Sequence, residues 1–171
     1  IERQLRAGEL DTQSPIPSTS ILWLRQNMPQ ALRTAPFLAV SYFALNNTQA
    51  AFKDVRVRKA INLAFDREAV TDKVLRLGDK PAYGIVPPGV ANFPGGAAMD
   101  FKPMPMPARI AAAQSLMQQA GYGPDNRLHL VLETTHDPDN KRVAAVMQAM
   151  LRTVFIDLEI QQVDLQIHYR N

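Results

Sequence analysis

Histidines are the first candidates for chemistry in this sequence, because no cysteine occurs among its 171 residues. The lack of cysteine excludes disulfides, thiolate metal sites and cysteine nucleophiles. His129, His136 and His168 are too far apart in the chain to form a local metal-ligand motif. The Phe-Pro-Gly-Gly segment at 93–96 lacks the spacing of a phosphate-binding loop, and no Gly-x-Ser-x-Gly elbow occurs. The sequence therefore predicts no catalytic residue, no metal and no cofactor.

His136 is the best placed of the three histidines, whereas His129 is expected on a strand face. His136 follows the apolar run 128–132, a predicted strand, and precedes a helix start at Asp137. Ligands of open α/β sheets bind at the carboxyl ends of strands, so His136 is either a ligand contact or a solvated loop residue. A hydrolase that uses His136 with Asp137 or Asp139 is an alternative hypothesis, although the sequence marks no nucleophile.

Basic residues raise a second alternative, a nucleic-acid-binding domain. The net charge is +3 and the isoelectric point about 9.4, but the excess of positive charge is small and scattered. Arg56, Arg58 and Lys59 form a basic cluster without interleaved aromatic residues or a recognised nucleic-acid-binding module. A solvated helix face explains this cluster better, so no nucleic-acid partner is predicted.

The elements that must position His136 form a strand, a helix and a second strand. Residues 128–132 are apolar, 138–153 carry a helical apolar stripe, and Ile156, Leu158 and Ile160 alternate with polar residues. Short connections between these elements predict a βαβ unit with parallel strands and Asp137 as the cap of the helix. This pattern is typical of the α/β class.

Helices are also predicted in the middle of the chain. Asp54 and Asp66 are placed to cap two consecutive helices, and Gly78 is expected to end the second. A third helix is expected from Pro107 to Gly121. The apolar stripe of the first helix is expected to face the core; its members are Val57, Ala60, Ile61 and Ala64.

Three further segments have recognisable patterns. Residues 18–27 are expected to form a short helix capped by Ser18 or Thr19. The run 37–45 is apolar on both alternating faces, which predicts a strand buried on both sides. Six prolines and four glycines occupy residues 84–107, which we expect to form an irregular surface loop.

The ends of the sequence suggest part of a longer polypeptide. The chain begins at Ile1 rather than at a methionine, and it stops at Asn171 shortly after the last predicted strand. We therefore expect an incomplete domain.

Residues 52–68 closely resemble the signature of bacterial extracellular solute-binding proteins of family 5, which are oligopeptide- and dipeptide-type receptors of ABC importers. The resemblance continues on both sides of this run. Residues 5–11 resemble the family's segment at the end of a helix, and residues 42–47 its strand ending in Asn. Residues 81–88, Pro-Ala-Tyr-Gly-Ile-Val-Pro-Pro, and the Ala-Gly-Tyr at 120–122 also match in the right order.

The resemblance implies part of a periplasmic-binding-protein-like fold of class II, which has two lobes, an α/β architecture and a mixed sheet with flanking helices. It implies that residues 1–36 belong to the first lobe and the approach to the hinge, near Pro36. Residues 37–171 then form an incomplete second lobe that contains the irregular loop 84–107.

The same resemblance implies binding rather than catalysis. A family member captures peptides, either oligopeptides or dipeptides, between its lobes and delivers them to permease subunits of the transporter. It works as a monomer when full length, in the periplasm or outside a Gram-positive cell on a lipid anchor. A metal chelate, haem or an oligosaccharide is an alternative ligand in this family.

Three residues are candidates for ligand binding: Tyr42, Tyr83 and His136. Tyr42 falls in the predicted strand 37–45, where an aromatic side chain packs in the core as readily as it faces a cleft. Asp54, Asp66 and Asp137 are expected to have structural roles as caps.

Overall fold

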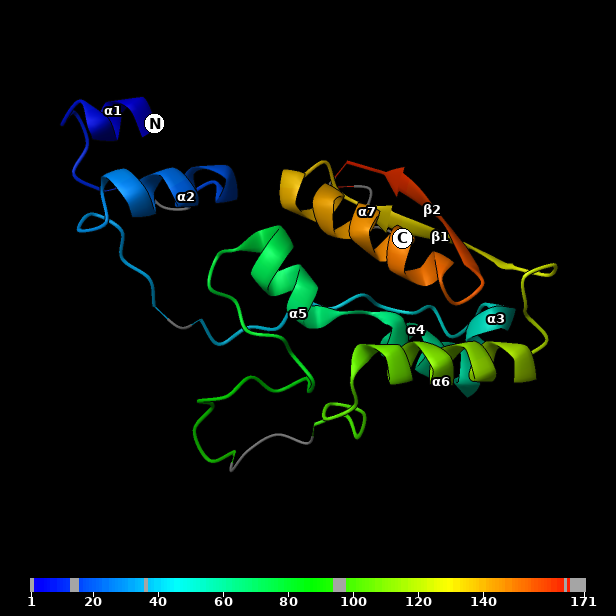
Figure 1. Cartoon of the computed structure of the whole chain (residues 1–171). Coiled ribbons are helices and arrows are strands. Elements are labelled where there is room, and N and C mark those ends of the chain that lie inside the picture. The colour runs from blue at the N-terminus through cyan, green and yellow to red at the C-terminus, as the bar shows by residue number, and fades with distance from the viewer. Residues whose placement is uncertain (1, 13–15, 36, 94–97, 165, 167–171) are drawn as a thin grey trace.

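The computed structural model describes residues 2–12, 16–35, 37–93, 98–164 and 166, and its elements are labelled in Figure 1. The helices are α1 Glu2–Arg6, α2 Ser18–Asn27, α3 Ala50–Lys53, α4 Val55–Ala64, α5 Arg67–Ala69, the π-helix η1 Val70–Leu75, α6 Met106–Gln119 and α7 Pro138–Arg152, and the strands are β1 Leu128–Thr134 and β2 Ile156–Gln162. No described helix is long and apolar enough to cross a lipid bilayer.

β1 and β2 pair in parallel, as the sequence predicted. Their register places Leu128 opposite Ile156 and Thr134 opposite Gln162. The helix between them, α7, packs on one face of the pair. Burial alternates along β1, so that His129 lies on the exposed face. This pair is the one sheet that the described residues form; the mixed sheet is what the resemblance implies for the larger fold of which this chain is part.

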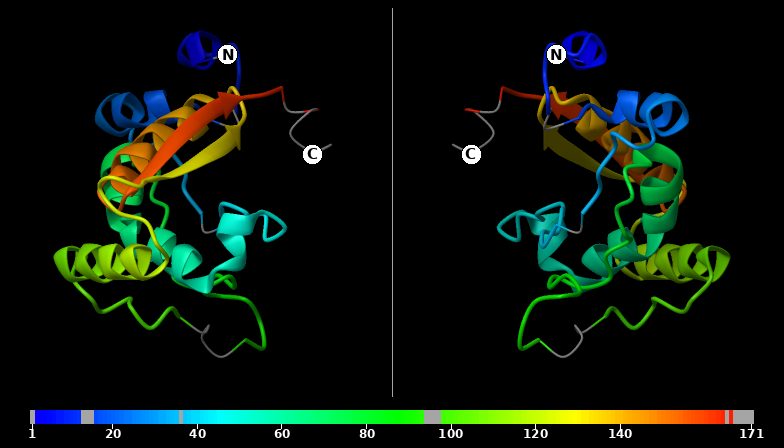
Figure 2. Two further views of the ribbon diagram at one scale, coloured as in Figure 1. Left: turned by 90° about the vertical axis from the view of Figure 1, so that its right-hand side faces the viewer. Right: turned by 90° about the vertical axis from the view of Figure 1, so that its left-hand side faces the viewer.

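The core lies between α4, α6, α7 and the covered face of the sheet, as the views in Figures 1 and 2 show. α4 packs along α6, and the alanines at their contact allow a close approach of the two backbones. Each large apolar side chain that is fully buried contributes about 1.5–3 kcal/mol. The side chains without exposed surface are Val57, Ala60, Ala64, Ala113, Met117, Ala144, Leu151, Val154 and Ile156.

Three aspartates cap helices, as expected. Asp54 Oδ1 accepts a hydrogen bond from the backbone amide two residues ahead at 2.8 Å. Asp66 Oδ1 accepts one from the amide three residues ahead at 2.9 Å. Asp137 Oδ1 accepts from two amides of the first turn of α7 at 2.9 and 3.0 Å. Each cap satisfies backbone donors that have no partner inside the helix.

Two predicted helix ends are wrong. Neither Ser18 nor Thr19 caps α2, because Pro17 occupies the N-cap position and the Ser18 hydroxyl contacts another helix instead. The second central helix continues from α5 into the π-helix η1 and ends before Gly78. Arg76 takes the left-handed conformation there, with φ 58°, which is uncommon for a residue with a side chain.

The prediction of a buried strand at 37–45 is also wrong. This segment has no helix or strand, and the side chains of Phe37 and Tyr42 are 87% and 72% exposed. A strand requires a hydrogen-bonded neighbour, and no described strand lies beside this segment. Its apolar pattern is therefore not matched by burial within the described residues.

The described residues of the proline- and glycine-rich region that precede α6, 84–93 and 98–105, form no helix or strand, and they extend away from α4 and α6 (Figure 2). α6 begins at Met106, one residue before the predicted start at Pro107. Gly121 follows the end of α6 with φ 91°, where glycine is favoured.

Candidate functional site

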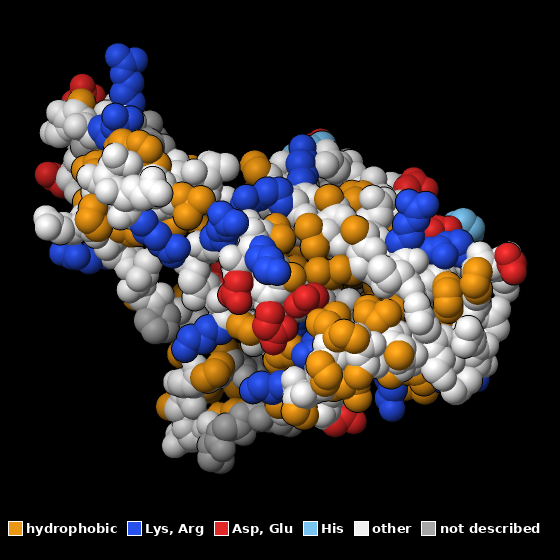
Figure 3. All heavy atoms as spheres, viewed as in Figure 1, with side chains coloured by type: hydrophobic (Ala, Val, Ile, Leu, Met, Phe, Trp, Pro, Cys, Tyr) orange, Lys and Arg blue, Asp and Glu red, His pale blue; other side chains and the backbone are white. Residues whose placement is uncertain are grey.

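A small, open groove with both polar and apolar lining lies between α2, η1 and α7, and we call it the α2–α7 groove. Its volume is about 130 Å³. Figure 3 shows that Lys and Arg side chains gather on this face, around the junction of α2 with the rest of the chain. The residues that line the groove are Ser18, Thr19, Leu22, Lys73, Val74, Leu75, Arg76 and Arg142.

Two of the residues that line the groove, Ser18 and Arg142, take part in a contact between α2 and the first turns of α7. The Ser18 hydroxyl donates to Asp139 Oδ1 at 2.5 Å, and Arg142 Nη2 donates to the Ser18 hydroxyl oxygen at 2.8 Å. Arg142 Nη2 also pairs with Asp139 Oδ1. These three side chains connect segments that are more than 120 residues apart in the sequence.

The first turns of α7 bring acidic and basic side chains together beside the groove. Asp137 caps the helix and Asp139 lies in its first turn, so both carboxylates meet the positive end of the helix dipole. Arg142, one turn further on, brings its guanidinium back over Asp139. Three cations, Lys73, Arg76 and Arg142, line the groove, which favours a ligand with an anionic or carbonyl group.

His136 lies after the carboxyl end of β1, as predicted, with its side chain 56% exposed. Its Nε2 is 3.7 Å from Asp164 Oδ1, on the segment that follows β2. Tyr42 is exposed and Tyr83 is buried. Although all three ligand-binding candidates are described, the structure gives no hydrogen bond, ion pair or ring contact between any two of them.

Tyr83 belongs to a buried polar cluster. Its hydroxyl donates to the two carboxylate oxygens of Glu68 at 2.7 and 2.8 Å and accepts from Arg109 Nη2 at 2.6 Å. The guanidinium carbons of Arg67 and Arg109 lie 5.1 and 5.2 Å from the centre of its ring. Burial and the hydrogen bond to Glu68 raise the pKa of Tyr83. The residue therefore joins the start of the irregular loop to α5 and α6.

Sequence reasoning missed the partners of Tyr83 in the buried polar cluster, and it did not anticipate the contact of Ser18 with Arg142. Arg109 is only 4% exposed, and burial lowers the pKa of Arg67. A signal for Arg109 was present, because it stands four residues before Ala113 on the stripe of α6 that faces the core. No spacing pattern pointed to Ser18 or Arg142, because their contact is between distant parts of the chain.

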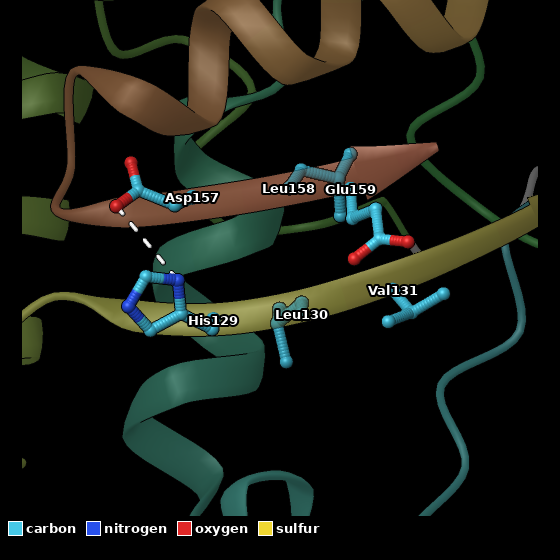
Figure 4. Close-up of a pocket in the computed structure, with 6 residues that line it drawn as sticks. All are labelled: His129, Leu130, Val131, Asp157, Leu158 and Glu159. Atoms are coloured by element: carbon cyan, nitrogen blue, oxygen red, sulfur yellow. Dashed lines mark ion pairs between the residues drawn. The ribbon is translucent and has the colours of Figure 1, made fainter. Parts of the chain in front are cut away.

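A second concave surface lies on the exposed face of the sheet, with a volume of about 290 Å³. As Figure 4 shows, His129 of β1 and Asp157 of β2 face each other there, and their Nδ1 and Oδ2 atoms are 4.0 Å apart. His129 is 82% exposed, which confirms its position on the strand face. The other residues that line this surface are Leu130, Val131, Leu158 and Glu159.

Neither surface carries an arrangement for catalysis or metal binding. Among the described residues, no group of three or more His, Asp or Glu side chains could hold a metal ion. The Ser18 hydroxyl is bonded to Asp139 and Arg142 rather than to a histidine that could activate it. Asp137 is occupied as a helix cap.

A family model described as bacterial extracellular solute-binding proteins, family 5 Middle, matches residues 2–171. The chain belongs to this family. The resemblance in the sequence is therefore confirmed, and family 5 consists of solute-binding proteins rather than enzymes.

Two relatives in family 5 are named for peptides. The chain is 31% identical over 161 residues to the periplasmic oligopeptide-binding protein OppA of Salmonella typhimurium, and this match covers 91% of the chain and 29% of OppA. It is 30% identical over 156 residues to the periplasmic murein peptide-binding protein MppA of Escherichia coli, with the same coverage of 91% and 29%. The chain thus spans less than a third of the length of these relatives.

Solved structures of two-lobed periplasmic binding proteins confirm the α/β fold class. The structure of Escherichia coli MppA has a TM-score of 0.89 at 28% identity, covering 99% of this chain and 33% of MppA. MppA in its unliganded open form has a lower TM-score of 0.82. The sequence identity is again 28%, and the match covers 99% of this chain and 33% of MppA. Brucella suis NikA in complex with Fe(III)-EDTA has a TM-score of 0.76 at 27% identity, covering 98% of this chain and 35% of NikA.

Proposed function

We propose that this chain forms part of the substrate-binding component of an ABC importer, which captures oligopeptides or dipeptides between two lobes and delivers them to a membrane permease. The observation that carries the proposal is the family match over residues 2–171. Relatives named for oligopeptides and murein peptide support peptides as the substrate class.

The α2–α7 groove supports a peptide ligand through its chemistry. A peptide presents carbonyl oxygens along its backbone and a carboxylate at its end, and both accept hydrogen bonds. The groove offers the Thr19 hydroxyl and the cations of Lys73, Arg76 and Arg142. Charge-assisted hydrogen bonds from such donors are roughly twice as strong as neutral ones.

The size of the groove indicates that other walls complete the binding site. Its volume of about 130 Å³ is below the ~300–1,000 Å³ of typical small-molecule sites. The chain covers 29% of OppA, so most of such a receptor lies outside the matched region. We therefore assign residues 1–36 to the first lobe and 37–171 to part of the second, with the ligand held between them.

The three candidate ligand residues differ in how they could act. Tyr42 and His136 have exposed rings that a ligand can reach directly. Tyr83 is 5% exposed and would act from the interior, by fixing Glu68 and Arg109. None of the three is among the residues that line the α2–α7 groove. In this proposal Tyr42 and His136 contact the ligand outside that groove, and Tyr83 supports the second lobe from the interior.

The relatives OppA and MppA are periplasmic proteins by name, which supports a periplasmic location for the proposed receptor. Its partners would be the peptide and the permease subunits, and it would act as a monomer. Attachment by a lipid anchor is the corresponding arrangement in a Gram-positive cell.

A second candidate function is binding of a metal chelate by the same receptor architecture. NikA, whose structure contains Fe(III)-EDTA, shares the fold at 27% identity. Haem and oligosaccharides are the remaining non-peptide alternatives in the family.

Mass spectrometry of the small molecules that co-purify from a bacterial periplasm with a full-length receptor containing this chain tests the proposal. We expect a series of short peptides, released when the protein is denatured. A single chelate, haem or sugar released in stoichiometric amount would contradict peptide transport and support the second candidate.

A further inference from the structure

Helix α2 is attached to the rest of the chain through a small set of contacts that are separate from the main core. The main cluster of buried residues, among those described, contains no member of α2. The two buried residues of the helix, Ile21 and Leu24, are therefore outside that cluster. The described residues between α2 and α3, 28–35 and 37–49, form no helix or strand. α2 can therefore change its position without disrupting the core.

We propose that the contact between Ser18, Asp139 and Arg142 is a latch that holds α2 against α7 in the closed arrangement of the two lobes. This inference rests on the proposed function, in which α2 and α7 belong to different lobes. The latch consists of the bonds from Ser18 Oγ to Asp139 Oδ1 at 2.5 Å and from Arg142 Nη2 to Ser18 Oγ at 2.8 Å, with the ion pair between Arg142 and Asp139.

The comparison with MppA supports this assignment. The chain superimposes better on one MppA structure, with a TM-score of 0.89, than on the unliganded open form, with a TM-score of 0.82. The aligned share of the chain is 99% in both cases, so the two MppA structures differ in how they arrange the region that corresponds to this chain. The arrangement that contains the Ser18 contact is the one less like the open form.

The chemistry of the latch suits a contact that opens and closes. Arg142 and Asp139 are on the same helix and remain close when α2 moves away, so their ion pair is kept while the two bonds to Ser18 are lost. Arg142 Nε is buried without a hydrogen-bond partner among the described residues, and its desolvation offsets part of the gain. The hydrogen bonds to Ser18 stabilise the closed state, and the desolvation of Arg142 Nε opposes them. The free-energy difference between the closed and open states is therefore small, as a switch requires.

The latch can be tested by measuring the distance between α2 and α7 in solution. The chain has no cysteine, so Gln26→Cys and Ala149→Cys, both at exposed positions, introduce a unique pair of nitroxide labels. Pulsed electron paramagnetic resonance then gives the distribution of distances between the two helices. We expect one dominant short distance for the labelled parent chain without ligand.

Arg142→Gln removes one charge-assisted hydrogen bond to Ser18 and should shift the population toward a longer distance by about tenfold. Ser18→Ala removes both bonds and should shift it at least as far. The double variant should shift it no further than the larger single effect, because both substitutions remove the same contact. Thr19→Ala and Lys73→Gln are the matched controls, since both residues line the groove without contacting Ser18 or Asp139. They should leave the distribution unchanged.

An unchanged distance distribution in both Ser18→Ala and Arg142→Gln would overturn the latch, as would equal shifts in the controls. Alanine is a good helix former, so Ser18→Ala is expected to keep α2 folded, which circular dichroism verifies. Failure of the latch is distinct from failure of the proposed function. The first changes only the distance measurement, whereas the second appears as the absence of co-purifying peptides.

Discussion

Arg109 Nη2 donates a hydrogen bond of 2.6 Å to the hydroxyl of Tyr83 in the interior of the protein. The same hydroxyl donates to Glu68, so a cation, a neutral hydroxyl and a carboxylate form a continuous chain. This chain connects three separate parts of the sequence: α5, the start of the irregular loop and α6. Together with the bonds from Arg67 Nε to the carbonyl of Ala82 and from Arg109 Nε to the carbonyl of Met104, it holds the loop on the helical core.

Removing the Tyr83 hydroxyl should destabilise the protein. Tyr83→Phe leaves Arg109 and Glu68 without a shared partner in a buried position, which we expect to cost about 1–3 kcal/mol of unfolding free energy. Urea denaturation measures this change. Tyr122→Phe is the control, because that partly buried hydroxyl has no hydrogen-bond partner in the described structure, and it should change stability little. Equal effects of the two substitutions would contradict the assignment.

The contribution of Tyr83 should also depend on pH. Its pKa is raised above 10.0 in the folded protein, mainly by burial, so the unfolded state loses this proton first as the pH rises. The stabilising contribution is therefore complete below the unfolded value and is lost as the pH rises through the folded value. The stability difference between the parent chain and Tyr83→Phe should stay constant at neutral pH and shrink in strong alkali. A difference that grows there would refute the predicted direction.

The pKa of Asp54 is lowered from 3.8 in the folded protein, because its carboxylate accepts hydrogen bonds from the side chain and the backbone of Arg56. A lowered pKa stabilises the fold above the unfolded value, and this contribution disappears as the pH falls through the folded value. Asp54→Asn should therefore be less stable than the parent at neutral pH and approach it in acid. Thermal melting over a pH series provides the measurement, and parallel curves at all pH values would rule out the effect.

The cap of α7 should contribute measurably to stability. Asp137→Ala leaves two backbone donors of the first turn unsatisfied and should cost about 1 kcal/mol, whereas Asp137→Asn keeps an acceptor and should cost less. Chemical denaturation of both variants distinguishes the two. If alanine and asparagine prove equally stable, the hydrogen bonds of Asp137 do not support the helix.

Met117 lies at the centre of the core with no exposed surface. Met117→Ala should destabilise the protein by about 2–5 kcal/mol, through lost burial and the cavity left behind. Gln118→Ala changes the neighbouring exposed residue on the same helix and should stay within about 0.5 kcal/mol. Calorimetry measures the unfolding free energy of the two variants. Equal losses of stability would contradict the packing of α6 in the structure.

The βαβ unit was predictable because its signals are local. Alternation along 156–160, the apolar stripe of α7 and the cap at Asp137 each indicate one element, and short connections then require parallel strands. The segment 37–45 shows the limit of such reasoning. Its pattern reports a tendency to be buried, but a strand also needs a neighbour, which a pattern in one segment does not supply.

The candidate site was less predictable than the fold. His136 could be placed at the end of β1, because its position follows from the order of the elements. The contact of Ser18 with α7 joins residues 121 positions apart in the sequence, and no local spacing encodes it. Arg109 was predictable in part. A cation on the apolar stripe of a helix indicates a polar cluster in the interior, but the stripe does not identify the partners of the cation.

Titration calorimetry with a pool of short peptides tests the proposed receptor role most directly. The titrations use the 171-residue chain and a receptor of the relatives' full length that contains it. Peptides should bind tightly to the full-length receptor and much more weakly, or not at all, to the chain alone, because the ligand would be held between two lobes. Tight binding by the chain alone, or no peptide binding by the full-length receptor, would contradict the account.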